Sequence, residues 1–137
     1  MRALGILIAA CGVLLAQKRD PVRVDPAHYS TDGSADGIIA LRLRLGPDET
    51  TPMAFIQDSL VVCLSECHVR VTLPKFTILK KVTIEPEYSV TRQTVDIHME
   101  AGTTRVMGAG MRAIENLSTK PVEMLFIERK EPGSDWK

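Results

Sequence analysis

The chain has 137 residues, which is enough for one ordinary domain with a real hydrophobic core. Hydrophobic residues make up 45% and charged residues 25%, a composition typical of a globular protein rather than a disordered one. Lys and Arg together number 17, as do Asp and Glu, so no basic excess is available to neutralise a phosphate backbone. Aromatic residues are only 4%, which leaves few surfaces on which bases could stack. We therefore expect no nucleic-acid partner.

The first sixteen residues differ in composition from the rest of the chain. Arg2 is followed by a wholly apolar run over 3–16, and polar residues follow at once. A run of this length is too short to span a bilayer comfortably and is typical of a secretory signal peptide (1–16) that is cleaved after Ala16. We therefore expect a bacterial protein exported to the periplasm or secreted. A buried first helix or an uncleaved anchor is one alternative, and a lipid on Cys11, which ends a lipobox-like sequence, is another.

The rest of the chain is rich in short strands. Residues 17–36 are polar and turn-rich and are interpreted as an N-terminal arm. Alternation of apolar and polar residues, or short apolar runs, then predicts strands at 39–45, 60–64, 69–73, 76–84, 94–99, 103–107 and 121–127. Gly and Pro residues separate these strands, and no segment after residue 16 has a helical period. The pattern indicates one antiparallel sandwich or barrel over 37–130, followed by a charged tail at 131–137.

Two stretches resemble the sequence motifs of a known family. Gly46–Met53, followed by Asp58–Val62, resembles the first motif of a small cupin-domain protein, and Ala101–Gly110, followed by Glu115–Pro121, resembles the second. The segment Val24–Tyr29 is similar to the start of exported members. This resemblance, over 24–130, implies an all-β fold: a single antiparallel cupin-like double-stranded β-helix, or jelly-roll barrel. It also implies a homodimer, because cupins are often dimers.

The residues that hold a metal in typical cupins are replaced here. The family's first motif carries two histidines and a glutamate, and its second motif carries a third histidine. The corresponding positions in this chain are Ala54 and Ile56, Leu60 or Val61, and Arg112. A register counted from Gly46 gives Pro52 and Ala54 instead, with Asp58 at the acid position and, from Gly110, Ala113 at the last. Ala and Ile have no lone pair to donate and Arg is a permanent cation, so we predict no metal and no cofactor.

No other metal site or catalytic group stands out. His98 and Glu100 share one face of a strand, but the alternation of their neighbours predicts that this face is exposed to solvent. On one continuous strand Cys63 and Cys67 would lie about 13 Å apart, beyond disulfide reach unless the chain turns between them, so we expect two free, apolar thiols. Asn116 begins a glycosylation-like triplet and is interpreted as a loop asparagine.

Arg112 gives the sharpest functional hypothesis. On the cupin alignment its guanidinium lies at the mouth of a barrel lined by Ala54, Ile56, Val61 and Cys63. A partly desolvated arginine among apolar walls is a good anchor for a carboxylate or phosphate, so we predict a site for a small organic anion. Alternatively, Arg112 pairs with an acid such as Asp58 or Glu115, or turns to solvent.

We expect a binding or structural module rather than a catalyst. Two other functions stay open. One is a metal-dependent cupin enzyme of the dioxygenase or isomerase type with non-standard ligands, and the other is a dimeric protein-interaction module.

Overall fold

The computed structural model describes residues 20–78 and 88–129. In them a short helix, α2 (Pro21–Val24), precedes nine strands. The strands are β1 (Tyr29–Ala35), β2 (Ile38–Leu45), β3 (Ala54–Ile56), β4 (Ser59–Cys63), β5 (Cys67–Ile78), β6 (Tyr88–Met99), β7 (Thr104–Met107), β8 (Gly110–Asn116) and β9 (Val122–Arg129). The predicted signal peptide, the lipid site at Cys11 and the predicted tail lie outside the described residues, so export stays a prediction. Within the described ranges no helix has the length and apolar character that a membrane span requires.

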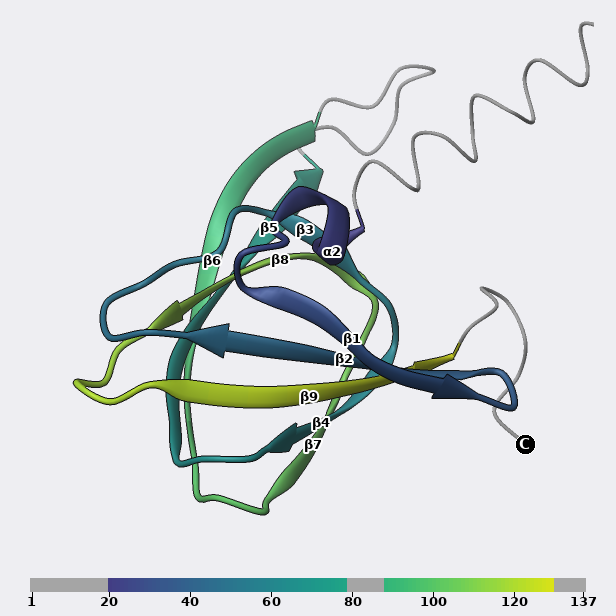
Figure 1. Ribbon diagram of the computed structural model, residues 1–137. Coiled ribbons are helices and arrows are strands. Elements are labelled where there is room, and N and C mark those ends of the chain that lie inside the picture. Colours follow the sequence, from purple (N-terminus) through teal and green to yellow (C-terminus); the bar gives the residue numbers. More distant parts are fainter. Residues whose placement is uncertain (1–19, 79–87, 130–137) are drawn as a thin grey trace, which may run out of the picture.

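The strands form two sheets that curl around a shared interior (Figure 1). One sheet has the order β1-β2-β9-β4-β7 and the other β3-β8-β5-β6, and the strand pairs are antiparallel. The prediction of an all-β antiparallel fold is confirmed. The positions that correspond to the metal ligands of typical cupins lie on β3, β4 and β8.

Alternation along the strands builds the core. In β2, Leu41, Leu43 and Leu45 are buried, whereas Arg42 and Arg44 between them face outward. The opposing faces contribute a continuous apolar cluster, which includes Tyr29, Ile56, Val61, Val69, Val71, Ile97, Ile114, Val122, Met124 and Phe126. Each large apolar side chain that is fully buried stabilises the fold by about 1.5–3 kcal/mol, so the interior also fixes the register of the strands.

The predicted N-terminal arm contains ordered structure. Asp20 caps α2, because its Oδ1 accepts a hydrogen bond from the backbone N–H of Val22 at 3.0 Å, and Pro21 occupies the first helical turn. β1 then pairs with β2 as an edge strand. Of β1 only Tyr29 is buried, so the sequence offers no alternation there. A one-turn helix and a one-sided edge strand both escape detection by periodicity.

Pro74 does not end a strand, contrary to the prediction of separate strands at 69–73 and 76–84, of which 79–84 lie outside the described residues. β5 runs through it, and Pro74 lies opposite Arg92 of β6. The ladder between β5 and β8 ends at Thr72, so β5 beyond this point has β6 as its partner on one side only. An edge position tolerates proline because no neighbouring strand on that side presents a carbonyl oxygen that would need a backbone N–H from this residue. The long β5–β6 hairpin extends away from the body of the barrel (Figure 1).

The outer face of the first sheet carries a row of apolar side chains. Ala40, Ile127, Leu60 and Val106 are cross-strand neighbours on β2, β9, β4 and β7. Val106 is 79% exposed. The homodimer stays a prediction.

His28 ties the N-terminal segment to the turn before β3. Its Nδ1 is 2.8 Å from Asp25 Oδ2, and its Nε2 contacts the carboxylate of Glu49, which also accepts a hydrogen bond from Gly46 N. Burial alone would lower the pKa of His28, but the hydrogen bonds to Glu49 and Asp25 outweigh it and raise the pKa above the ordinary value of 6.5. The hydrogen bond from His28 holds the pKa of Glu49 below its ordinary value of 4.5.

We expect His28→Gln to destabilise the fold in a restricted pH range. The stabilisation by protonated His28 is fully present below about pH 6.5 and is lost as the pH rises through the raised pKa. The Glu49 contribution is present above about pH 4.5 and is lost as the pH falls through the lowered pKa. Urea unfolding should therefore show a larger difference between wild type and variant at pH 5.5 than at pH 9. An equal difference at both pH values would contradict this assignment.

Candidate functional site

The motif positions meet on the inner face of β3 and β8. Ala54 lies directly opposite Arg112, and Ile56 opposite Gly110. Ala54 and Ile56 are fully buried, and Val61 on β4 is 2% exposed. The structure therefore brings together four of the predicted site residues, Arg112, Ala54, Ile56 and Val61, around one end of the interior.

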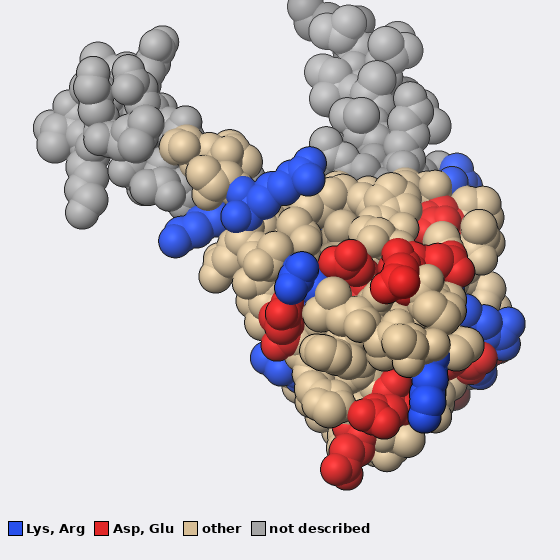
Figure 2. All heavy atoms as spheres, turned by 90° about the vertical axis from the view of Figure 1, so that its left-hand side faces the viewer, with Lys and Arg blue, Asp and Glu red and all other residues tan. Residues whose placement is uncertain are grey.

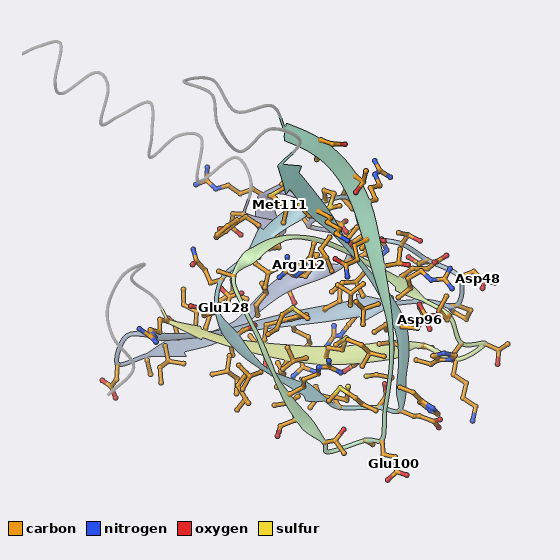
Figure 3. All side chains as sticks on the ribbon, turned by 180° about the vertical axis from the view of Figure 1, so that it is seen from behind. Asp48, Asp96, Glu100, Met111, Arg112 and Glu128 are labelled. Carbon is orange, nitrogen blue, oxygen red and sulfur yellow. The ribbon has the colours of Figure 1, made fainter. Side chains whose placement is uncertain are left out.

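Arg112 is half-buried and hydrogen-bonded to backbone carbonyls. Its Nη1 donates to Met111 O at 2.9 Å and its Nη2 to Gly108 O at 3.3 Å, so the side chain folds back along its own strand (Figure 3). Gly110 makes room for this, because a Cβ there would lie 2.5 Å from Nη1 of Arg112. In the described ranges no acid pairs with Arg112. The predicted alternative partners are engaged elsewhere: Asp58 accepts from Ala109 N at 2.7 Å, and Glu115 lies 3.7 Å from Arg70.

Two further polar groups, which the sequence analysis missed, face the same end of the interior. Ser59 and Glu128 are direct cross-strand partners on β4 and β9. Ser59 Oγ and Glu128 Oε1 are both buried, and no described residue forms a hydrogen bond to either atom. Burial, with a smaller contribution from Asp20, raises the pKa of Glu128 to about 7. A buried carboxyl oxygen without a partner costs free energy, and such groups concentrate at functional sites.

Glu128 and Ser59 each break the apolar alternation of their strand. Glu128 follows Val122, Met124 and Phe126 in the inward positions of β9. A period of two therefore predicts an apolar residue at 128. The acid at this position is the feature of the sequence that could have identified Glu128 as an inward-facing polar residue.

These polar groups surround one turn of the chain. Asp58, the neighbour of Ser59, accepts the hydrogen bond that ties down the turn at Gly108–Gly110, and Arg112 bonds back to that same turn. Among the described residues no ion pair joins Arg112 to Glu128. A cation without a counterion and a carboxyl group with an unpartnered oxygen therefore line the same end of the barrel without contacting each other. The short helix α2 packs against β3 at this end, and the charge of Asp20 before it contributes to the raised pKa of Glu128.

Cys63 lies apart from these groups. It is four residues beyond Ser59 on β4, and its thiol is 3.8 Å from Sδ of Met99. The chain turns between Cys63 and Cys67, and both cysteines are free and buried, as the sequence predicted. The structure thus assigns Cys63 to the opposite end of the interior from Arg112.

The inner-face residues do not fit a metal of the cupin type. Ala54 and Ile56 offer no donor atom and Arg112 is a cation, which leaves the carboxyl group of Glu128. In the part of the chain that the structure describes, no three His, Cys, Asp or Glu residues converge on a common point. His98 points to solvent as predicted, with its side chain 62% exposed and Nε2 2.8 Å from Glu66 Oε1.

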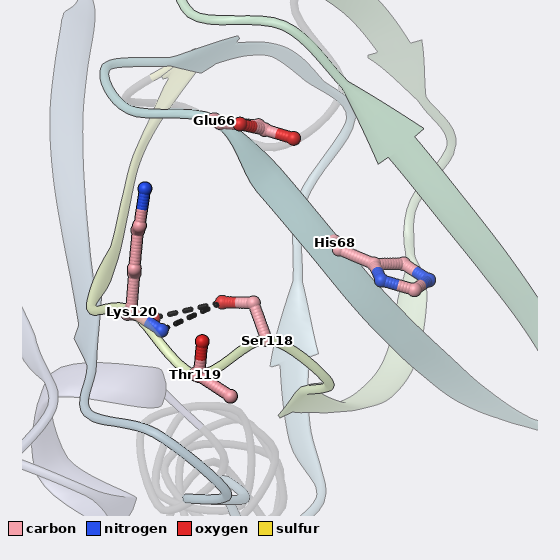
Figure 4. Close-up of a pocket in the computed structure, with 5 residues that line it drawn as sticks. All are labelled: Glu66, His68, Ser118, Thr119 and Lys120. Atoms are coloured by element: carbon pink, nitrogen blue, oxygen red, sulfur yellow. Dashed lines mark hydrogen bonds between the residues drawn. The ribbon is translucent and has the colours of Figure 1, made fainter.

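A hollow of about 210 Å³ lies on the outside of the barrel (Figure 4). Glu66, His68, Ser118, Thr119 and Lys120 line it. The hydroxyl of Ser118 is engaged with Lys120 O at 2.8 Å, and it also donates to Asn116 Oδ1. Since Ser118 forms structural hydrogen bonds here rather than contacting His68, the hollow has no activated nucleophile.

Comparison with known proteins identifies the fold. No family model matches the chain, and no curated protein does. Among solved structures, a cupin domain from Bordetella pertussis Tohama I aligns with a TM-score of 0.55 at 15% identity, over 75% of this chain and 92% of that one. The chain has the cupin fold. A second cupin-fold match, hydroquinone 1,2-dioxygenase PnpCD in complex with Cd²⁺ and 4-hydroxybenzonitrile, aligns with a TM-score of 0.50 at 18% identity, over 86% of this chain and 70% of that one.

The cupin fold alone does not decide the function. One of the two matched structures is an enzyme, and the other is described only as a cupin domain. A function therefore has to be argued from the residues that line the barrel.

Proposed function

We propose that this cupin-fold protein binds a small organic anion at the end of the barrel that Arg112 lines. The observation that carries the proposal is the half-buried guanidinium of Arg112, which forms hydrogen bonds to the carbonyls of Gly108 and Met111 and pairs with none of the described acids. Carbonyl oxygens satisfy part of its hydrogen-bonding capacity but leave its charge without a counterion. A carboxylate supplies both the missing negative charge and further hydrogen-bond acceptors, and a planar guanidinium binds it through two parallel hydrogen bonds.

Ser59 and Glu128 support a ligand with a second polar end. Their buried, unpartnered oxygens lie on the same inner face, and ligand atoms would satisfy them. With a pKa of about 7, Glu128 is divided near neutral pH between a protonated form that donates a hydrogen bond and an ionised form that accepts one. A carboxylate that also carries a hydroxyl or carbonyl group matches Arg112 at one end and Glu128 at the other.

The molecular surface supports a small ligand rather than a polyanion. Acidic and basic side chains are interspersed on the face shown in Figure 2, and the whole chain has equal numbers of each. A polyanion requires a broad basic face, whereas one arginine among the apolar walls of Ala54, Ile56 and Val61 suits a small molecule.

A screen of small acids tests the proposal. We expect at least one of acetate, lactate, malonate, succinate and benzoate to raise the melting temperature of the wild-type protein at pH 7 in the millimolar range. Arg112→Ala should remove this effect, because the anchor for the carboxylate is lost. Arg105→Ala is the matched control, since Arg105 is an exposed arginine on β7, and it should respond like the wild type.

The two possible failures have different meanings. If no acid in the panel stabilises the wild type, the anion site is contradicted. If an acid stabilises wild type and Arg112→Ala equally, anion binding occurs elsewhere and Arg112 is not its anchor.

A further inference from the structure

Three sulfur atoms converge at the end of the interior opposite Arg112. Sγ of Cys63 is 3.8 Å from Sδ of Met99. Cys67 and Met99 are direct cross-strand partners on β5 and β6. Sγ of Cys67 lies 3.4 Å from Ser65 O and 3.7 Å from Glu123 O, and Glu123 O also accepts from the backbone N–H of Leu64, the residue after Cys63. Met99 therefore contacts Cys63 and lies directly opposite Cys67.

The spacing of these atoms suits a common metal ligand set. With metal–sulfur bonds of about 2.3 Å, two ligands of a tetrahedral or trigonal site lie about 3.8–4.0 Å apart. The distance of 3.8 Å between Cys63 and Met99 falls in this range. Met124, the direct partner of Cys63 on β9, is buried on the same inner face and adds a fourth sulfur-bearing side chain to this region.

We propose that Cys63, Cys67 and Met99 form a site for a soft monovalent metal ion, copper(I). Thiolate and thioether sulfur together favour copper(I). Zinc in proteins is held by Cys, His, Asp and Glu side chains, and Met is not among its usual ligands. Binding replaces the two thiol protons by one Cu⁺, releases two H⁺ and leaves the oxidation states of copper and sulfur unchanged. The site lies at the other end of the barrel from Arg112 and does not depend on the anion proposal.

The surroundings allow the ion to enter while keeping water away from it. Cys63 and Cys67 are both 0% exposed. Met99 is half-buried and lines a surface hollow of about 500 Å³ together with Thr103 and Thr104. The thioether is therefore the ligand that an incoming ion meets first, and the thiols lie behind it.

An anaerobic titration tests the site. The fully reduced protein is titrated with copper(I) in competition with a chromophoric copper(I) chelator, and thiolate-to-copper absorption is followed in the ultraviolet. We expect one copper(I) per chain. Cys63→Ala and Cys67→Ala should each weaken binding by more than about 100-fold, because losing a ligand exceeds the 10–100-fold loss typical of an outer-shell residue. Met99→Leu, which preserves the packing, should weaken it by about tenfold.

Two controls locate the site. Met107→Leu replaces an inner-face methionine of β7 outside the cluster and should bind copper(I) like the wild type. Arg112→Ala should also bind it normally, which separates this proposal from the anion site.

Three results would overturn the inference. The first is copper(I) binding no tighter than that of a Cys63→Ala, Cys67→Ala double variant. The second is copper(I) affinity that Met99→Leu leaves unchanged. The third is zinc binding as tight as copper(I) binding.

Discussion

Replacing Asn116 with alanine is expected to lower the free energy of unfolding by about 3–4 kcal/mol. Asn116 is fully buried at the end of β8. Its Nδ2 donates to the carbonyls of Leu45, Gly46 and Lys120 at 3.3, 3.0 and 2.8 Å, and its Oδ1 accepts from the backbone N–H and the hydroxyl of Ser118. The side chain thus joins the end of β2 to the turn before β9. Alanine would leave several of these groups without partners, and each buried unsatisfied group costs about 1–3 kcal/mol.

Urea unfolding of wild type, Asn116→Ala and Ser118→Ala measures this effect. Ser118→Ala removes one hydroxyl from the same network and leaves the Asn116 amide in place, so it should cost about 1 kcal/mol. If Asn116→Ala costs no more than Ser118→Ala, Asn116 does not hold the turn in the way described. The same geometry shows that Asn116 is a buried strand residue and not the loop asparagine expected from the sequence.

Replacing Glu128 with glutamine is expected to stabilise the protein at pH 8 by about 2–3 kcal/mol and to have little effect at pH 4. Its folded-state pKa of about 7 lies above the ordinary value of 4.5. The folded state therefore binds more protons than the unfolded state between these values, and the stability of the wild type falls as the pH rises through this range. Glutamine is neutral throughout and avoids this loss.

Unfolding measured at pH 4, 6 and 8 tests the sign as well as the size of the effect. The matched control is Glu100→Gln, because Glu100 is exposed at a turn on the outside of the barrel (Figure 3) and should change stability little at any pH. If Glu128→Gln changes the free energy of unfolding equally at pH 4 and pH 8, the Glu128 carboxylate is well solvated or paired, and its pKa is not raised by burial. A stabilised variant that also binds the panel acids more weakly would indicate that Glu128 is kept for binding rather than for stability.

Much of the fold could be predicted from the sequence because alternation is a local signal. The inward Leu41, Leu43 and Leu45 and the outward His98 follow directly from it. The signal fails where only one residue of a strand is buried, as in β1, or where the outcome depends on a strand distant in the chain. Pro74 is tolerated because the pairing of β5 with β8 stops at Thr72. The sequence around residue 74 carries no information about where this pairing ends.

The sequence indicated part of what lines this end of the barrel. The motif comparison singled out Ala54, Ile56 and Arg112, and the structure places them on one inner face because β3 pairs with β8. Glu128 was missed because it lies outside both motifs, although its position in the alternation of β9 sets it apart. The separation of Cys63 from Arg112 could not be predicted, because it depends on the turn that brings Cys63 toward Cys67 and Met99.

Nuclear magnetic resonance can detect the proposed anion site at Arg112 residue by residue. The protein is labelled with ¹⁵N and titrated at pH 7 with the panel acid that stabilises it most. If the anion binds at Arg112, we expect saturable shifts of the Arg112 Nε–H signal and of the amides of residues 108–112, Ser59 and Glu128, with the Arg105 Nε–H signal unchanged. Shifts confined to the outer hollow around Lys120, or an Arg112 signal that does not move at saturation, would contradict it.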